Sequence, residues 1–461
     1  MKYTTLIIVL AVALLFSELS TALSHSTAVS VLDENFDLHE AVRVFDEWFD
    51  AHYKLKRSVK LAVAGEGMRL GVVATQRIAA DSLYLSIPLN IIIYDNTIFS
   101  TNGIGVALQK VLKLVPSSFQ KQQLALNLFL THQRFVAGNR SFFHPYIQLL
   151  PSEHDVPEFY NDDDLALLKG TQIPSKARAE RSRHRKEYEA LVTVLRNFAN
   201  VFPLHTFSYE NYVWAQGILN TRMIWWDGVP HLVPLLDMIN CRQGPKGHRV
   251  HSTKRGASNR ADTYAPWEFQ SGDQVFENYG QPNPTYFLWH GFAMEPNMHD
   301  CAQVVPSPVS FWSKATRVHQ EAVQRLQLSR PEFCVRPDAS KLEEFLTLAR
   351  VVSMSENDAK LLKAPPTKFV SRVNEGKALT LVKKSVEAHL NAMKNESDIM
   401  AITDSLETPF RRKMIQLFLR GQRAILSETV DALEKRIAPL RRKKPQSSIE
   451  PSSESGNSDE L

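Results

Sequence analysis

The sequence predicts an α+β protein, and three observations support this class. A glycine-rich turn at residues 65–71 precedes short segments with strand character, and strand character returns near residues 232–239 and 274–278. Residues 105–222 show mostly helical spacing. Helical spacing also continues beyond residue 306. Small sheets with a helical insertion, followed by a helical region, indicate more than one domain.

The individual elements follow from local patterns. Residues 36–56 carry apolar side chains at helical spacing, which indicates an amphipathic helix. The segments 72–74 and 83–87 are rich in Val, Leu and Ile and read as strands, the second of which ends at Pro88. The clearest helical segments of the remaining chain are 124–135, 342–353, 377–393 and 411–436.

Composition sets broad limits on the class of protein. A chain of 461 residues has room for two or three domains. An apolar share of 44% and a charged share of 22% are ordinary for a soluble globular protein. The net charge of +5 is modest for this length, so we expect no nucleic-acid partner.

The first residues have the pattern of a secretory signal peptide. Lys2 precedes an unbroken apolar run at residues 6–16, and small residues follow at 20–22. We therefore expect residues 1–22 to be a cleaved signal, with an uncleaved anchor as the alternative. The run is short for a bilayer span, which needs about 20 apolar residues, so we expect no stable membrane insertion after cleavage.

The last residues resemble an address for return to the endoplasmic reticulum. Residues 441–461 are expected to form a disordered tail, since Ser, Glu and Pro dominate residues 445–459. The tail ends in Ser-Asp-Glu-Leu, where Ser458 replaces the usual lysine. Together the two ends predict a protein of the endoplasmic reticulum lumen, where the glycosylation acceptors Asn139 and Asn395 would matter. A chance acidic tail is the alternative.

Cysteine usage excludes two kinds of site. The chain has 3 cysteines, so at most one disulfide can form and one thiol is left over. There is no CxxC and no paired Cys/His spacing, so we expect no metal site.

Other chemistries find little support. The glycine-rich turn lacks the spacing of a nucleotide-binding loop, and no GxSxG elbow is present. Cys241 could act as a nucleophile, but nothing local marks it for that role. The basic stretch at residues 176–186 is either a solvated helix face or a patch for an acidic substrate.

A series of short motifs gives the sequence its most specific signal. Its two main segments are Pro234-Leu235-Leu236-Asp237-Met238-Ile239-Asn240 and Glu277-Asn278-Tyr279-Gly280. Around them, in order, stand Leu70-Gly71-Val72-Val73-Ala74, Phe143-His144-Pro145-Tyr146, Thr221-Arg222, Asn283 and Gly291-Phe292. The series resembles the branch of SET-domain protein methyltransferases that includes Rubisco large-subunit lysine methyltransferase and actin-histidine methyltransferase.

The resemblance implies both a fold and an activity. Residues 36–300 would form a SET domain of small β-sheets with a pseudoknot, carrying the helical insertion at about 105–222. Residues 306–440 would form an all-α substrate-binding domain. The activity would be methyl transfer from S-adenosyl-L-methionine to nitrogen, most simply on a lysine of a protein substrate, and the oligomeric state stays open.

The resemblance also assigns residues to roles. Arg222 would hold the carboxylate of S-adenosyl-L-methionine, because a guanidinium matches a carboxylate in a forked geometry. Asn240 and the backbone at Cys241 would fix another part of the donor, and Met68 and Leu70 would offer backbone contacts from the glycine-rich turn. No metal would be needed.

Two further residues would act on the acceptor. Tyr279 would be the catalytic tyrosine, with a hydroxyl that orients the nitrogen, and Asp237 would position the substrate segment. The alternative for Tyr279 is a core aromatic whose hydroxyl satisfies a carbonyl. An amine must be neutral to attack, and burial beside a sulfonium lowers the pKa of a lysine from about 10.4.

The sequence departs from the branch at two positions of the site. Cys241 stands where the branch has histidine, and His290 stands where it has tyrosine. The role of Glu66 depends on how the glycine-rich turn is aligned. A histidine acceptor and a catalytically weak protein-binding module are therefore the alternatives to a lysine methyltransferase.

Overall fold

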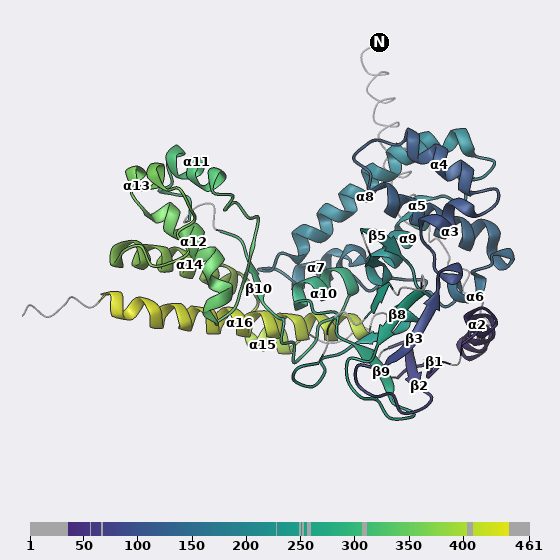
Figure 1. Cartoon of the computed structure of the whole chain (residues 1–461). Coiled ribbons are helices and arrows are strands. Elements are labelled where there is room, and N and C mark those ends of the chain that lie inside the picture. The colour runs from purple at the N-terminus through teal and green to yellow at the C-terminus, as the bar shows by residue number, and fades with distance from the viewer. Residues whose placement is uncertain are drawn as a thin grey trace, which may run out of the picture. The chain divides into compact units, whose positions relative to one another are not determined.

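The structure is a computed structural model that describes residues 36–55, 57–65, 68–226, 228–248, 250, 253–255, 260–306, 311–402 and 409–441 (Figure 1). The predicted signal peptide, Glu66 and the retrieval sequence lie outside these residues. The chain divides into two compact units. The first unit comprises Met1–Phe159, Arg178–Gly280 and Trp289–Gly291, and the second comprises Tyr160–Ala177, Gln281–Leu288 and Phe292–Leu461.

The first unit contains the small sheets. A four-stranded sheet has the order β1 (Val59–Val63), β2 (Leu70–Ala74), β9 (Gln274–Glu277) and β6 (Asn240–Cys241). A three-stranded sheet has the order β3 (Leu83–Pro88), β8 (Arg260–Tyr264) and β7 (Thr253–Arg255). A hairpin joins β4 (Ile224–Trp226) and β5 (Val229–His231). The strands predicted at 72–74, 83–87 and 274–278 are thus confirmed.

The strand predicted near residues 232–239 is wrong. That segment is a buried loop with a short 3-10 turn, η7 (Leu236–Met238), and strand β6 begins only at Asn240. Leu232, Val233 and Leu235 are fully buried, which explains their apolar character without a strand. Leu235 has a φ of 72°, a left-handed conformation that interrupts an extended backbone. A short apolar run cannot reveal which buried conformation it adopts.

Helices cover the sheets in the first unit. The predicted N-terminal helix is α2 (Leu38–Tyr53), which begins after Asp37, whose carboxylate accepts hydrogen bonds from the first backbone amides. The predicted helix at 124–135 begins as α5 (Lys121–His132), which packs against α9 (Tyr209–Arg222). The other helices of the first unit are α3 (Asp95–Ser100), α4 (Gly105–Leu114) and α6 (His144–Ile147). Helix α7 (Asp162–Leu167) belongs to the second unit, and α8 (Ile173–Leu195) begins in the second unit and continues in the first.

The second unit is mainly helical, as predicted. Its long helices are α12 (Ala339–Ser353), α14 (Arg372–Ala392) and α16 (Pro409–Arg441), which match the three predicted segments. The shorter elements are α10 (Asn283–His290), β10 (Ala302–Val304), α11 (Arg317–Arg325), β11 (Phe333–Val335), α13 (Glu356–Leu361) and α15 (Glu396–Met400). A buried ion pair between Arg350 and Glu375, 2.7 Å apart, joins α12 to α14.

Cys301 and Cys334 form the one disulfide that the cysteine count allows. The bridge joins the two short strands β10 and β11, and Cys241 lies outside it. Among the described residues, no group of three or more His, Cys, Asp or Glu side chains is arranged to hold a metal ion. Within the same residues, every helix is too short or too polar to cross a bilayer.

The basic stretch at residues 176–186 is engaged in local pairing. Lys176 forms an ion pair with Glu332 at 2.6 Å. Arg183 pairs with Glu180 and Glu187 on its own helix. These contacts fit a solvated helix face rather than a patch for an acidic substrate.

Candidate functional site

A short parallel pairing brings the two main motif segments together. Strand β6 lies beside β9, with Asn240 opposite Phe276 and Cys241 opposite Glu277. The pairing continues one residue further, where the amide of Arg242 donates to the carbonyl of Glu277 at 2.9 Å. Polar groups that lie some forty residues apart in the sequence therefore meet at one end of this sheet.

Tyr279 lies immediately beyond β9. Its hydroxyl donates a hydrogen bond to the carbonyl oxygen of Ile239 at 2.7 Å. Its ring lies beside the ring of His290, with centroids 5.8 Å apart and planes inclined at 53°. The side chain is therefore held from two sides, and its oxygen is fixed against the backbone of the first motif segment.

His290 is a half-buried neighbour of Tyr279. Burial lowers the pKa of its imidazole, while the backbone carbonyl of Thr221 acts in the opposite direction. Nδ1 lies 3.2 Å from that carbonyl, which can only accept, so Nδ1 carries the proton and donates. The motif resemblance implies a tyrosine at this position, and the imidazole presents no hydroxyl.

Arg222 ends helix α9 and reaches the first motif segment. Its Nη1 donates to the backbone carbonyl of Asp237 at 2.8 Å and lies 3.8 Å from the carboxylate of the same residue. Its Nε is buried and has no hydrogen-bond partner. A buried N–H without an acceptor costs free energy, and a ligand carboxylate would satisfy it. The residue thus fits the predicted role toward a carboxylate-bearing donor.

The side chain of Asp237 is held by two neighbouring residues. The carboxylate is completely shielded from solvent, and the hydroxyl of Tyr146 donates to it at 2.5 Å. Burial raises the pKa of Asp237 to about 6, against the opposing effects of Arg222 and Tyr146. The carboxylate contacts Arg222 and Tyr146, and its Oδ1 is buried with no hydrogen-bond partner, so the predicted substrate-binding role of Asp237 stays a prediction. Tyr146 carried no predicted role, since 91 residues separate it from Asp237.

Asn240 connects two predicted cofactor segments to each other. Its side-chain amide donates to the carbonyl oxygen of Leu70 at 2.8 Å, which ties β6 to β2. Leu70 is buried, while Asn240 and Cys241 remain half-buried. The structure thus brings Leu70, Asn240 and Cys241 together, and the amide of Asn240 holds the sheet at this point.

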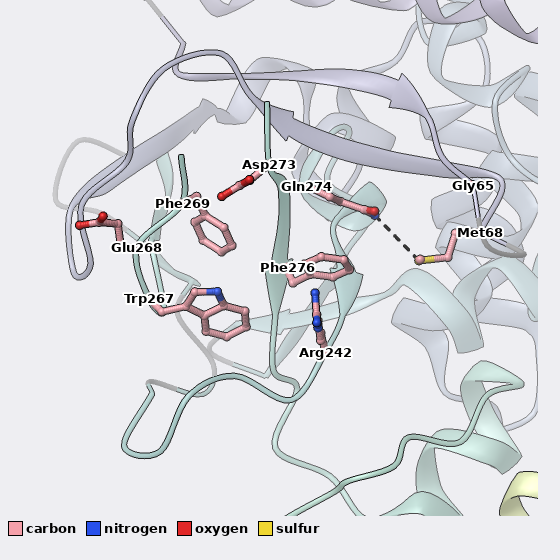
Figure 2. A pocket seen from close by; sticks show the side chains of 9 residues that line it. All are labelled: Gly65, Met68, Arg242, Trp267, Glu268, Phe269, Asp273, Gln274 and Phe276. Carbon is pink, nitrogen blue, oxygen red and sulfur yellow. Dashed lines mark hydrogen bonds between the residues drawn. The ribbon is translucent and has the colours of Figure 1, made fainter. Parts of the chain in front are cut away.

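A pocket of about 520 Å³ opens beside the glycine-rich turn (Figure 2). Met68 lines it, and it is the single predicted site residue to do so. Figure 2 shows the Arg242 guanidinium against the ring of Phe276, 5.3 Å from the ring centroid, and Gln274 directed toward Met68. The full lining is Gly65, Met68, Arg242, Trp267, Glu268, Phe269, Asp273, Gln274 and Phe276. Aromatic faces beside a cation suit a flat, polar-edged ligand.

Sequence reasoning missed several residues of this region. Arg242, Trp267 and Phe276 line the pocket. Arg242 could have been predicted as a site residue, because it follows the first motif segment closely in the sequence. Tyr84 on β3 was also missed, and its hydroxyl is buried with no hydrogen-bond partner. Burial raises the pKa of Tyr84 far above its usual value, and the charge of Glu277 adds to the effect.

Several known proteins are similar to parts of this chain. Residues 317–426 match the Rubisco LSMT substrate-binding family. The actin-histidine N-methyltransferases of Rattus norvegicus and Homo sapiens are each 27% identical over 310 residues, which cover 63% of this chain and 49% of theirs. The enzyme of Mus musculus is 28% identical over 250 residues, 51% of this chain and 39% of that one. The chain thus spans about half the length of the curated relatives it matches.

Solved structures share the fold over most of the chain. Rubisco LSMT bound to AdoMet superimposes with a TM-score of 0.65 at 19% identity, covering 87% of this chain and 93% of that one. The SET domain of LSMT bound to lysine and AdoHcy gives 0.66 at 18% identity, covering 88% and 93%. The resemblance read from the motifs is confirmed: the chain has the α+β SET-domain fold of the Rubisco LSMT structures, with a helical Rubisco LSMT substrate-binding domain, and it is related in sequence to the actin-histidine N-methyltransferases.

Proposed function

We propose that this protein is an S-adenosyl-L-methionine-dependent protein N-methyltransferase that modifies a lysine side chain of another protein. The observation that carries the proposal is the convergence of Tyr279, Arg222 and Asn240 around the β6–β9 pairing. Three side chains of these types, each held in place by a backbone group, match a reaction in which alignment supplies most of the acceleration.

The donor would be held by residues of the first unit. Arg222 would take the carboxylate of S-adenosyl-L-methionine, with Asp237 and Tyr146 fixing the guanidinium from behind. The turn from Met68 to Leu70 and the backbone at Cys241 would supply further contacts. When bound, this donor supplies an electrophilic methyl group on a sulfonium.

Tyr279 would act on the acceptor nitrogen. Its hydroxyl is rigidly placed against the Ile239 carbonyl, so the two oxygens together offer a polar edge to an incoming amine. Free lysine has a pKa of about 10.4, and transfer into a desolvated site lowers it. The acceptor can then enter in its neutral form, and the proton leaves to solvent before the transfer.

A histidine acceptor is the second candidate within the same reaction class. The sequence relatives are named as histidine enzymes, whereas a structural neighbour is bound to lysine. Transfer of a labelled methyl group from S-adenosyl-L-methionine to microsomal protein, followed by residue analysis, separates the two. Label recovered as methyl-lysine supports the proposal, and label recovered as methyl-histidine replaces it with the second candidate.

A catalytically weak protein-binding module is the alternative from another class. It is favoured by the departures at Cys241 and His290, and by the engagement of the Tyr279 hydroxyl with a backbone carbonyl. Calorimetric titration with S-adenosyl-L-methionine tests it directly. Absence of binding by folded protein, together with absence of automethylation, would exclude the enzyme.

We also propose that the protein works in the endoplasmic reticulum lumen. The leader pattern at residues 1–22 and the final Ser-Asp-Glu-Leu support this location. The Cys301–Cys334 disulfide is consistent with it, since such bonds persist in oxidising compartments. A fluorescent protein inserted before Ser458 should label the reticulum, and a cytosolic or nuclear signal would refute the proposal.

A further inference from the structure

The second unit contains a groove that the proposed methyl-transfer site does not use. Its volume is about 660 Å³, and its lining comes from the segment before α11, from α11 itself, and from α12, α14, α16 and the residue that follows α12. Figure 1 labels these helices. The lining residues are Phe311, Ser313, Lys314, His319, Val352, Ser353, Met354, Arg372, Val373, Gly376, Lys377, Thr380, Leu381, Lys384, Ile437, Leu440 and Arg441.

The charge of the groove has one sign. Among the described lining residues, none is acidic and five are lysine or arginine: Lys314, Arg372, Lys377, Lys384 and Arg441. All five are exposed to solvent. Positive charges gathered in a hollow reinforce one another and attract an anionic ligand from a distance. The groove therefore favours anionic ligands, although the chain as a whole has a net charge of only +5.

Two of these lysines form a stripe on one helix. Lys377 and Lys384 are seven residues apart on α14, and the lining residues Val373 and Leu381 share that face. Neither lysine lies within ion-pair distance of an acidic side chain in the described part of the chain. Lys383, the direct neighbour of Lys384, instead pairs with Glu434 at 2.5 Å and with Glu387 at 3.0 Å. Adjacent lysines thus differ, with one neutralised by α16 and the other presented to the groove.

Arg372, unlike Lys377 and Lys384, is engaged by backbone carbonyls. Its guanidinium donates to the carbonyls of Pro439 and Leu440, at 2.8 Å and 3.3 Å. These carbonyls belong to the last turn of α16, where the helix dipole concentrates negative charge. Arg372 therefore compensates the end of α16, where Arg441 also lies and interacts with the charge of Glu434. The charge offered to a ligand comes mainly from Lys314, Lys377 and Lys384.

The groove also has apolar walls. Phe311, Val352 and Ile437 are buried behind it, and Val373 lies at its edge with 67% of its surface exposed. A ligand that combines carboxylates with an apolar side chain would match both features. Single-stranded nucleic acid needs exposed aromatic faces for stacking, and the one aromatic side chain of this lining, Phe311, is buried.

We propose that this groove binds an acidic peptide segment, containing at least one apolar residue, of the protein substrate. The inference rests on the proposed function, because it assigns the groove to the protein that is to be methylated. It narrows the substrate class to proteins that carry a Glu- or Asp-rich segment in addition to the acceptor residue.

The test is fluorescence anisotropy of the full chain with a labelled Glu-rich peptide that contains two leucines. A peptide with Gln in place of Glu is the matched ligand. The test variant is Lys377→Glu with Lys384→Glu, and the matched variant is Lys363→Glu with Lys368→Glu. The second pair makes the same change of charge at two exposed lysines of the same unit that do not line the groove. Thermal unfolding checks that both variants fold.

The acidic peptide should bind, and the Gln peptide should bind about tenfold more weakly or not at all. Added salt should weaken the binding, because the contacts are exposed and screened. The Lys377/Lys384 variant should lose about tenfold in affinity, and the Lys363/Lys368 variant should stay within about twofold of the wild type. Equal effects of the two variants, or equal binding of the two peptides, would overturn the proposal.

Two further measurements distinguish a failure of the groove proposal from a failure of the proposed methyltransferase function. If deletion of residues 445–461 raises affinity for the peptide about tenfold, the chain's own acidic tail is the occupant and the proposal is wrong. Titration with S-adenosyl-L-methionine is run on the same proteins, and the groove variant should bind it like the wild type. A wild-type chain that binds the peptide but not S-adenosyl-L-methionine would refute the methyltransferase while the groove's selectivity stands.

Discussion

The hydroxyl of Tyr279 is anchored to the backbone carbonyl of Ile239 by a hydrogen bond of 2.7 Å. This contact joins the two motif segments at the point where β6 and β9 run parallel. A tyrosine hydroxyl that is shielded from water takes a hydrogen-bond partner, and here the partner belongs to the other motif segment. The contact fixes the oxygen at the junction of the two segments, where the proposed role places it.

Replacement of Tyr279 with phenylalanine should separate binding from catalysis. The proposed role predicts that kcat falls about a hundredfold or more, because one preorganised polar group is lost from the reacting centre. Affinity for S-adenosyl-L-methionine should change little. Tyr188→Phe is the matched variant, since its hydroxyl also donates to a backbone carbonyl, that of Phe207 at 3.0 Å. Equal activities of the two variants would assign Tyr279 a structural role.

Arg222 should control affinity for the donor. Truncation to alanine removes a charged hydrogen bond worth about 1.5–3 kcal/mol, so Kd should rise about 10- to 100-fold in calorimetric titration. Lysine should not restore it, because an ammonium cannot keep the contact with Asp237 and also present a fork. The control is Arg57→Lys, at a similarly buried arginine that pairs with Asp46. Unchanged binding in Arg222→Ala would show that the donor carboxylate lies elsewhere.

The carboxyl group of Asp237 should make stability depend on pH. Its pKa is raised by burial from 3.8 to about 6, so the folded protein holds a proton that the unfolded chain releases between these values. This group therefore favours folding at about pH 4, and that contribution is lost as pH rises through about 6. Relative to the wild type, the free energy of unfolding of Asp237→Asn should rise by about 2 kcal/mol from pH 4 to pH 7. Denaturant titrations at both pH values measure it, and a constant difference would contradict the raised pKa.

Local patterns predicted the elements that bury one face or lie between clear turns. The α2 helix and strands β2, β3 and β9 belong to this group. The segment at residues 232–239 was misassigned, because a buried loop shows the same apolar run as a strand. Leu235, directly before the 3-10 turn, has a left-handed backbone conformation, and a leucine gives no sequence signal for that conformation.

Motif order predicted which residues gather at the site, but not what each one contacts. Asp237 was expected to bind the substrate, and its hydrogen bond with Tyr146, 91 residues away in the sequence, could not be foreseen. The charged groove could not be predicted from the sequence for the same reason. Its basic residues come from several separate segments, whereas Arg183, in the dense basic run at residues 176–186, pairs with acidic residues of its own helix.

Removal of the Cys301–Cys334 disulfide should destabilise the second unit. The two cysteines are separated by 33 residues, and closing a loop of this length in the unfolded chain contributes about 3–4 kcal/mol. The double change Cys301→Ala with Cys334→Ala should lower the free energy of unfolding by this order. Dithiothreitol should affect the wild type similarly and leave the double variant unchanged. Cys241→Ala is the control, and a wild type insensitive to reductant would argue against the bridge.

Lumenal synthesis should leave a glycan on Asn395. The residue is exposed and caps helix α15, where its Oδ1 accepts hydrogen bonds from the amide of Asp398 and the hydroxyl of Ser397. An endoglycosidase should therefore increase the mobility of the protein made in cells. Ser397→Ala should abolish that part of the shift while keeping the capping asparagine, since the acceptor tripeptide requires Ser or Thr. Glu396→Gln is the matched variant, because it alters the same tripeptide without removing the acceptor. Loss of the shift in both variants, or its absence from the wild type, would count against occupancy of Asn395 and, in the second case, against the lumenal location.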